Sequence, residues 1–205
     1  MKNKYDKIFV IGFNKTATLT FHHLFLKNGL KSQHNNIWDT EIFDCFSDNG
    51  DFHDFKELDQ KYNGFFILNT RHINKWMISR FKHGLRKRKE WGYPCSIEKC
   101  ETWIRQRENH FHKILEYFVQ FPEKLIIVNI EKPGWEKFIS KKLNFKHKEI
   151  NPYNVFETKL DYSAHKEIIK IVNNTLDKLE IDQDNLLLYD KQTEKKYLNI
   201  YDHYI

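Results

Sequence analysis

Three short and almost entirely apolar runs, each followed by an amphipathic segment, constrain the fold of this chain more than any other feature. The runs cover residues 7–13, 64–70 and 125–130. Continuous apolar runs rich in β-branched and aromatic residues are typical of strands buried on both faces of a sheet. Strands that alternate with helices usually pair in parallel, with helices on both faces. The sequence therefore predicts a three-layer α/β/α domain with a central parallel sheet.

The helices are predicted from apolar residues that recur every three or four positions. Ser96 is a suitable N-terminal cap for a long helix that ends near Phe118. Each of the three runs is followed by its own helix, and a further helix closes the pattern. These four helices are expected over residues 17–28, 73–82, 134–143 and 161–179.

The remaining segments have weaker patterns. We expect a short strand at residues 30–33 and a helix over residues 53–62. The polar tail after about Leu188 is expected to pack loosely. Seven glycines and four prolines, none of them gathered into a linker, leave no obvious domain boundary. The prediction is one domain over residues 1–205.

The composition favours a folded, basic protein. Aromatic residues make up 16% of the chain, a share that disordered chains rarely reach. The formal net charge is +6 and the isoelectric point is about 9.0, which predicts an anionic partner without naming it.

The cysteines and the apolar runs bear on the compartment. Three cysteines, an odd number without disulfide or metal spacing, favour a reducing environment. The apolar runs are far shorter than the roughly 20 residues that cross a bilayer. The first run is also too short for the core of a signal peptide. We therefore expect a soluble, cytoplasmic protein that does not bind a membrane.

The loop after the first predicted strand has the composition of an anion-binding site. In open parallel sheets, ligands bind beyond the carboxyl ends of the strands, and the first N–H groups of a helix favour anions. Lys15 adds a charge there, and Thr16, Thr18 and Thr20 add hydroxyl groups. The loop is not a Walker A motif, because Lys15 follows Gly12 by three residues and no second glycine precedes it. An ordinary lysine beside a threonine-capped helix is the alternative.

Arg71 and Ser79 follow the second predicted strand. Arg71 comes directly after the strand, and Ser79 lies eight residues later, about two turns into the next helix. If the two strands are parallel neighbours, Arg71 lies at the same sheet edge as Lys15. An arginine binds phosphate through two hydrogen bonds, and a serine adds another donor. Two such sites would fit a nucleoside with phosphate-like groups at both ends, and a surface ion pair of Arg71 is the alternative.

These two loops resemble the sulfotransferase family that uses 3′-phosphoadenosine 5′-phosphosulfate. The resemblance rests on KIFVIGFNKTATLT (residues 7–20) and FFILNTRHINKWMIS (residues 65–79). It implies a P-loop NTPase-like fold and transfer of a sulfuryl group to a hydroxyl or amine of a small-molecule or glycan acceptor. The chain is most similar to compact bacterial or viral-type members. Later segments stand in the family's order at residues 107–118, 124–130, 134–139 and 151–155.

The resemblance also implies which residues hold the donor. In the family, a K-[TS]-G-T-[TS] loop holds the 5′-phosphosulfate, and an arginine with a downstream serine, here Arg71 and Ser79, holds the 3′-phosphate. The family's loop glycine is an alanine here, which costs about 1 kcal/mol if that position needs a positive φ. The implied 5′ site consists of Lys15, Thr16, Ala17, Thr18, Leu19 and Thr20.

Sulfuryl transfer needs in-line attack and neutralisation of the charge on the leaving oxygen. The resemblance assigns that neutralisation to Lys15. It also implies a glutamate or histidine base on the segment after the first helix. Glu41 is the first choice for the base, because its acidic and aromatic surroundings resemble glycan-modifying members, and His34 is the second.

Two other functions remain open from the sequence. A nucleotide-dependent phosphotransferase is disfavoured by the Walker spacing and by the lack of a clear magnesium-binding aspartate at a strand end. A catalytically silent nucleotide- or nucleic-acid-binding protein would agree with Ala17 and with the basic run at residues 80–89. Nucleic acid is not favoured, since no recognised nucleic-acid-binding fold accompanies the run. No metal site is expected, because neighbouring histidines do not share a helix face and no cysteine is spaced for zinc.

Overall fold

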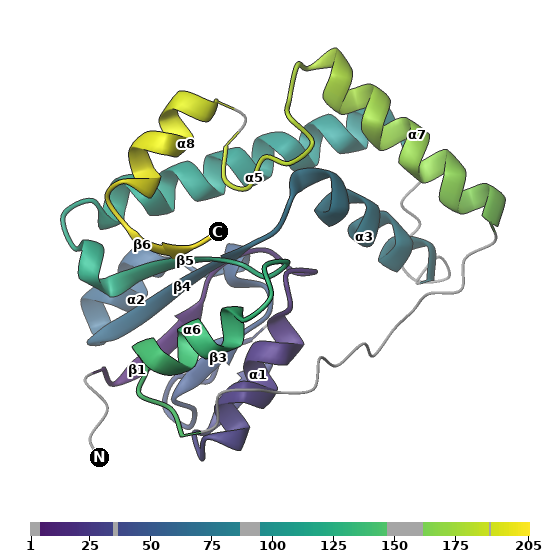
Figure 1. Ribbon diagram of the computed structural model, residues 1–205. Helices are drawn as coiled ribbons and strands as arrows, with labels where there is room; N and C mark the ends of the chain where they lie inside the picture. The colour runs from purple at the N-terminus through teal and green to yellow at the C-terminus, as the bar shows by residue number, and fades with distance from the viewer. Residues whose placement is uncertain (1–4, 35–36, 87–94, 147–161, 189) are drawn as a thin grey trace.

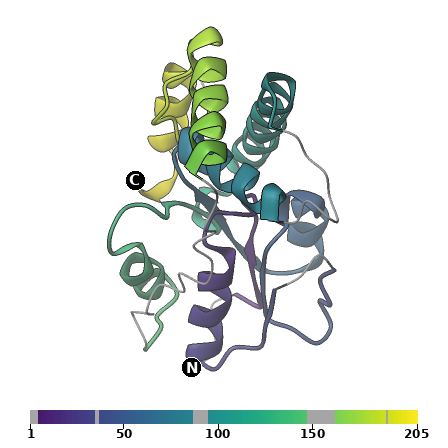
Figure 2. The same cartoon turned by 90° about the vertical axis from the view of Figure 1, so that its right-hand side faces the viewer.

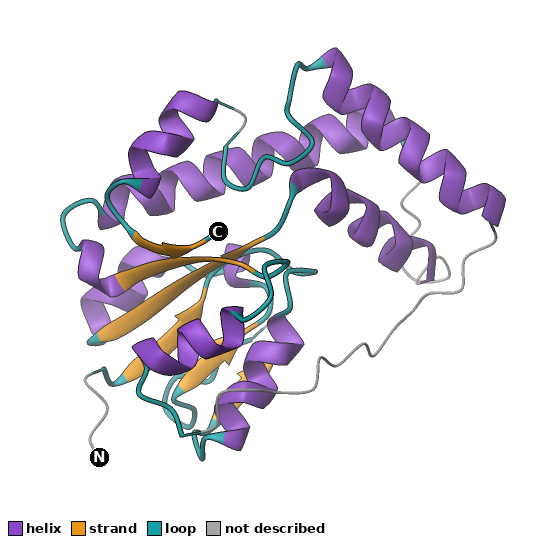
Figure 3. Ribbon diagram, viewed as in Figure 1, coloured by secondary structure: helices purple, strands orange, loops and turns teal. Residues whose placement is uncertain are grey.

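The computed structural model describes residues 5–34, 37–86, 95–146, 162–188 and 190–205. A sheet of six parallel strands runs through its centre in the order β2-β3-β1-β4-β5-β6 (Figure 1, Figure 3). The strands are β1 (Lys7–Val10), β2 (Ser32–His34), β3 (Cys45–Ser47), β4 (Gly64–Thr70), β5 (Leu125–Asn129) and β6 (Asp202–Tyr204).

Helices cover both faces of this sheet, which confirms the predicted three-layer α/β/α arrangement. In Figure 2, the purple α1 and the green α6 lie at the opposite end of the molecule from the yellow α8 and the light-green α7. Within the described ranges, no helix combines the length and the apolar character needed to cross a membrane. The helices are α1 (Thr18–Lys27), α2 (Phe55–Lys61), α3 (Ile73–Arg86), α5 (Ile97–Phe118), α6 (Trp135–Lys142), α7 (Tyr162–Lys178) and α8 (Lys191–Leu198), with 3₁₀ turns η1 (Gly50–Phe52) and η2 (Pro122–Lys124).

The core forms two layers because successive strand residues point to opposite faces. On β1, Phe9 packs into the layer beneath α3, α5 and α7, and Ile8 and Val10 pack into the layer beneath α1 and α6. All seven residues of β4 are buried, as expected for a central strand with both faces covered.

The predicted long helix is present with the predicted ends. Ser96 lies before α5, and its hydroxyl accepts a hydrogen bond from the Lys99 N–H at 3.2 Å. This cap satisfies one of the unpaired N–H groups at the helix start. The helix ends at Phe118, and both β4 and the helices after the three apolar runs lie within a few residues of their predicted positions.

The tail after Leu188 differs from the expectation of loose packing. It contains α8 and β6, which pairs with β5 at the edge of the sheet. The Glu194 side chain accepts hydrogen bonds from the N–H groups of Leu187 and Leu188, and the Tyr201 hydroxyl donates to the Leu115 carbonyl. Tyr197 and Tyr201 are buried. The polar composition of the tail gave no indication that Tyr197 and Tyr201 would be buried and attach it to α5.

The strand order makes the carboxyl ends of β1 and β4 the place where open α/β sheets usually bind ligands. These strands are neighbours, but β1 leads to α1 on one face of the sheet and β4 leads to α3 on the other. Loops that leave adjacent parallel strands toward opposite faces open a crevice between them, which is the usual ligand site of open α/β sheets. The fold therefore places the loops of Lys15 and Arg71 next to each other at this edge of the sheet.

Candidate functional site

One buried amide, that of Asn69 on β4, holds the loop between β1 and α1. Its side-chain oxygen accepts from the Gly12 N–H at 2.9 Å, and its amide group donates to the Thr16 carbonyl at 2.7 Å. A β-carbon at Gly12 would lie 2.1 Å from the Asn69 carbonyl oxygen, so only glycine fits there. Sequence reasoning assigned no role to Asn69. The available signal was a polar residue inside an apolar strand run.

The backbone of this loop enters the left-handed region twice. Lys15 has a φ of 66° and Ala17 has a φ of 61°. The position where the resembling family has glycine therefore does adopt a positive φ, and alanine accepts a cost of about 1 kcal/mol there. Ala17 directly precedes α1, whose first turn has no acidic residue. The positive end of the helix dipole faces the loop with no acidic side chain of that turn to offset it.

The hydroxyl groups of the loop differ in part from the expectation that they face a ligand. Thr16 Oγ1 donates to the Phe13 carbonyl and accepts from the Asn69 amide at 2.6 Å, so it serves the loop itself. Thr18 Oγ1 donates to Asp48. Leu19 and Thr20 lie on the first turn of α1, where Thr20 is buried and Leu19 is half-buried. The other groups of this loop that suit an anion are the Lys15 ammonium and the backbone N–H groups at the start of α1.

Arg71 lies at the same sheet edge as Lys15, as the sequence predicted for two parallel neighbouring strands. Arg71 follows β4 directly, and its Nη1 donates to the Lys15 carbonyl at 3.3 Å. The guanidinium is 21% exposed, and its Nε is buried without a hydrogen-bond partner. The two loops thus contact each other at the carboxyl edge of the sheet.

Arg71 also forms an ion pair with Glu131, in the loop after β5. Its Nη2 lies 3.1 Å from Glu131 Oε1, and the other carboxylate oxygen accepts from the His72 N–H at 3.0 Å. Lys75 Nζ lies 3.3 Å from the same carboxylate. Burial alone would raise the pKa of Glu131, but Arg71, the His72 N–H and Lys75 together lower it below its ordinary value. Glu131 stays ionised and orients Arg71, so an anion at Arg71 must share it with this carboxylate.

A second arginine, Arg107 of α5, lies directly behind Arg71. Its guanidinium is buried and donates to the Arg71 carbonyl at 3.1 Å and to Thr70 Oγ1 at 3.3 Å. Burial lowers the pKa of Arg107 to about 9, which still leaves it charged at neutral pH. It fixes the end of β4 and adds positive potential behind the site. Sequence reasoning had no signal that separated Arg107 from the other charged residues of its helix.

Ser79, the other predicted residue of the 3′-phosphate site, lies on α3 two turns after Arg71. Its side chain is half-buried. The next residue, Arg80, stacks on Trp103 with 4.4 Å between the guanidinium carbon and the ring centroid. The helix that carries Ser79 thus begins at the site and leads away from the sheet (Figure 1).

His34 lies at the same edge of the sheet, at the end of β2, and faces an aspartate that sequence reasoning missed. Asp48 directly follows β3, and its Oδ2 lies 3.9 Å from His34 Nε2. The other oxygen, Oδ1, accepts from Thr18 Oγ1 at 3.3 Å. His34 Nδ1 lies 3.2 Å from Ser47 Oγ. Asp48 therefore connects His34 to the first turn of α1.

The surroundings of His34 keep it neutral at pH 7. Burial is the largest cause that lowers its pKa below 6.5, and His23 and Lys15 lower it further, whereas Asp48 and a hydrogen bond to the Ser47 backbone oppose the shift. A neutral imidazole carries one N–H donor and one nitrogen lone pair. The side chains of His34 and Asp48 are 22% and 24% exposed, so both are accessible from the site.

The placement of Glu41 contradicts its selection as the first-choice base. Glu41 precedes β3 and interacts with Lys61 Nζ and the Tyr62 hydroxyl, at 3.3 Å and 3.4 Å. These partners precede β4, so all three lie at the amino edge of the sheet, opposite Lys15. Glu41 is 79% exposed. The acidic and aromatic residues around Glu41 suggested a base, but they precede β3 and therefore lie at its amino end. This could not be predicted, because β3 is only three residues long and leaves no recognisable pattern in the sequence.

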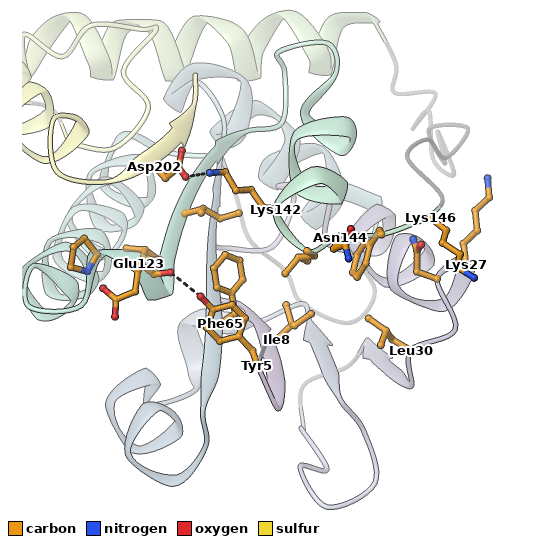
Figure 4. A pocket seen from close by; sticks show the side chains of 16 residues that line it. Tyr5, Ile8, Lys27, Leu30, Phe65, Glu123, Lys142, Asn144, Lys146 and Asp202 are labelled. Atoms are coloured by element: carbon orange, nitrogen blue, oxygen red, sulfur yellow. Dashed lines mark hydrogen bonds and ion pairs between the residues drawn. The ribbon is translucent and has the colours of Figure 1, made fainter. Parts of the chain in front are cut away.

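A cavity of about 750 Å³ lies near the amino edge of the sheet, on the side opposite Lys15 and Arg71 (Figure 4). Ile8, Phe65 and Leu125, near the amino ends of three strands, line its apolar wall. Tyr5 donates to the Glu123 carbonyl at 3.2 Å, and Lys142 pairs with Asp202 at its rim. None of the residues predicted for donor binding or catalysis lines this cavity.

Across the part of the chain that the structure describes, no group of three or more histidine, cysteine, aspartate or glutamate side chains is arranged to hold a metal ion. Comparison of the sequence and the structure with family models, curated proteins and solved structures found no match.

Proposed function

We propose that this chain is a sulfotransferase that moves a sulfuryl group from 3′-phosphoadenosine 5′-phosphosulfate to an acceptor. The observation that carries the proposal is the contact between Arg71 Nη1 and the Lys15 carbonyl at 3.3 Å. It supports the sequence prediction that two anion-binding loops, which match the family's motifs except at Ala17, belong to one ligand. A P-loop NTPase-like origin of the fold is part of the same proposal.

Each loop would hold one end of the donor. The N–H groups at the start of α1 and the Lys15 ammonium would bind the 5′-phosphosulfate, because both offer positive charge to its oxygens. Arg71, with Ser79 further along α3, would bind the 3′-phosphate. Arg107, buried behind Arg71, would strengthen that binding by its charge.

The chemistry requires little of the protein beyond position and charge. The acceptor oxygen attacks sulfur in line with the bond to the 5′-phosphate, and negative charge develops on the leaving oxygen. Lys15 would neutralise that charge. The acceptor must also lose a proton, and of the two bases predicted from the sequence only His34 lies at this edge of the sheet.

Binding of 3′,5′-bisphosphoadenosine, measured by titration calorimetry, tests the proposal. We expect the wild-type protein to bind this product more tightly than ATP with magnesium. Lys15→Ala and Arg71→Ala should each weaken binding at least about tenfold, because each removes a charged partner of a phosphate. Lys61→Ala is the control, since Lys61 is an exposed lysine at the amino edge.

Three outcomes count against the proposal. Unchanged binding in both Lys15→Ala and Arg71→Ala would remove the assigned site. Tighter binding of ATP with magnesium than of the bisphosphate would favour a phosphotransferase. Tight bisphosphate binding without sulfuryl transfer to any acceptor would leave a silent nucleotide-binding protein, which the Arg71–Glu131 ion pair would help to explain.

A further inference from the structure

Asp48 has the position of a reacting group beside the proposed donor site. It lies in the loop after β3, and β3 is the neighbour of β1 in the sheet. Its Oδ1 is 3.3 Å from Thr18 Oγ1, on the first turn of α1, where the N–H groups are directed at the donor. A carboxylate so close to an anion site repels the donor, which is unfavourable unless the carboxylate has a use there.

The loop that carries Asp48 is built with little freedom. Asp48 and Asn49 are both left-handed, with φ values of 82° and 52°. Gly50 follows, and a β-carbon there would lie 2.5 Å from Cα of Ile11, at the end of β1. Left-handed residues cost energy and persist where the surrounding structure holds them. The contact with Ile11 ties the position of Asp48 to the strand that carries the Lys15 loop.

Asp48 and His34 are spaced so that one hydroxyl group beside them could contact both side chains. Asp48 Oδ2 and His34 Nε2 are 3.9 Å apart, too far for a direct hydrogen bond. An oxygen about 2.8 Å from each atom would complete two hydrogen bonds that meet at roughly 90°. The Asn49 amide donates to the same Oδ2 at 3.3 Å, which leaves that oxygen a further lone pair.

The hydrogen-bonding groups of these two side chains also complement a hydroxyl. His34 is neutral, and Ser47 Oγ lies beside its Nδ1. When the Ser47 hydroxyl donates to Nδ1, the imidazole proton resides on Nε2. A hydroxyl beside the two side chains then accepts from His34 Nε2–H and donates to the Asp48 carboxylate.

We propose that Asp48 is the catalytic base and that the acceptor group is a hydroxyl, held between Asp48 Oδ2 and His34 Nε2. The inference rests on the proposed function. In the reaction, the acceptor oxygen forms a bond to sulfur while the bond from sulfur to the 5′-phosphate oxygen breaks. The leaving oxygen keeps that electron pair beside Lys15, and the hydroxyl proton passes to Asp48 and then to solvent. His34 is then a hydrogen-bond donor to the acceptor.

The variant Asp48→Asn tests the role of the carboxylate. Asparagine adopts a positive φ at least as readily as aspartate, so the loop should keep its shape. With the sulfuryl donor and phenol as the acceptor probe, release of 3′,5′-bisphosphoadenosine should slow at least about 100-fold. Affinity for the bisphosphate should not weaken. Asp44→Asn is the matched control, an aspartate at the other end of β3 that pairs with Lys7, and it should keep the wild-type rate.

The variant His34→Gln separates the two members of the pair. Glutamine places an N–H donor near the position of Nε2 but does not take up a proton at neutral pH. If Asp48 is the base, the rate of 3′,5′-bisphosphoadenosine release falls only about tenfold in His34→Gln, which is the effect of one weakened hydrogen bond. A loss in His34→Gln as large as the loss in Asp48→Asn would overturn the assignment.

A comparison of two acceptors tests whether the acceptor group is a hydroxyl. Aniline has the ring of phenol with an amine in place of the hydroxyl, and transfer to aniline should be at least about tenfold slower. Equal rates with phenol and aniline would overturn the hydroxyl assignment. An Asp48→Asn rate equal to the wild-type rate, or bisphosphate binding with no transfer to phenol in the wild type, would overturn the role of Asp48. Absence of bisphosphate binding in the wild type would instead remove the proposed function itself.

Discussion

The two edges of the sheet differ in the way they use polar residues. At the carboxyl edge, charged and polar groups gather around backbone held in unusual conformations, with positive φ at Lys15, Ala17 and Asp48. At the amino edge, Glu41 and Lys61 form an exposed pair, and the 750 Å³ cavity has an apolar wall formed by Ile8, Phe65 and Leu125. The cavity and the cluster of charged groups around the left-handed backbone are therefore in different places.

This difference shows that size alone does not identify the site. A cavity between the ends of strands and helices can result from imperfect packing, and apolar walls by themselves are non-directional. The carboxyl edge instead contains features that cost stability, namely the buried Arg107 and the left-handed loop residues. Costly features concentrated in one place indicate function more strongly than empty volume does.

The largest effects are expected from replacing a buried polar residue at either edge of the sheet, Asn69 at the carboxyl edge or Asp59 at the amino edge. Asn69→Ala leaves the Gly12 N–H without its partner and should lower the free energy of unfolding by about 2–4 kcal/mol. It should also abolish bisphosphate binding, because the Lys15 loop loses its anchor. Asp59→Ala at the amino edge breaks contacts with Lys124 and Tyr117, at 2.7 Å and 3.0 Å, and should lower stability by about 1–3 kcal/mol without changing that binding.

Denaturant unfolding and calorimetry measure both quantities for these two variants. Asn69→Asp, which keeps an acceptor for the Gly12 N–H but loses the donor to Thr16, provides a milder second variant at the same position. Equal loss of bisphosphate binding in Asn69→Ala and Asp59→Ala would show that binding does not depend on the carboxyl edge in particular.

The next largest effect is a change of the free energy of unfolding with pH, caused by His22, which lies on α1 beside His34. Burial, followed by the charges of His34 and His23, lowers the pKa of His22 to about 4 from 6.5. A histidine with a lower pKa in the folded state binds fewer protons there than in the unfolded state. Its contribution to stability is complete above pH 6.5 and is lost as the pH falls toward 4.

Urea unfolding at several pH values between 7 and 4 checks this prediction. One proton contributes at most about 1.4 kcal/mol per pH unit to the slope. His22→Gln should flatten the curve in this window, because glutamine does not titrate. Parallel curves for the wild type and His22→Gln would show that His22 is not the source.

The smallest expected effect uses the two alanines of the chain, Ala17 and Ala164. Ala17→Gly should stabilise the protein by up to about 1 kcal/mol, because glycine has no penalty at the φ of 61°. Ala164→Gly, within α7, should destabilise it by about 1 kcal/mol, because glycine is a poor helix former. Thermal unfolding measures both. Destabilisation by Ala17→Gly would mean that the loop does not hold this conformation in solution.

Much of the fold and half of the site could be predicted from the sequence. The runs that became β1, β4 and β5 are apolar at nearly every position, and α5 carries both its apolar stripe and its Ser96 cap. The location of Lys15 and Arg71 at the same sheet edge was also predicted, because it needed only that two strands be parallel neighbours. Short elements were missed, since β3 and β6 have three residues each and no period is visible over three residues.

The sequence by itself determined the layered architecture and the presence of two cationic loops, since both follow from local apolar patterns and from residues adjacent in the chain. Only the tertiary structure decided that Asp48 faces His34 while Glu41 lies at the opposite edge. Seven positions separate these two carboxylates in the chain. Because β3 runs between them, its insertion next to β1 places one at each end of the sheet, and that insertion depends on long-range strand pairing rather than on local sequence.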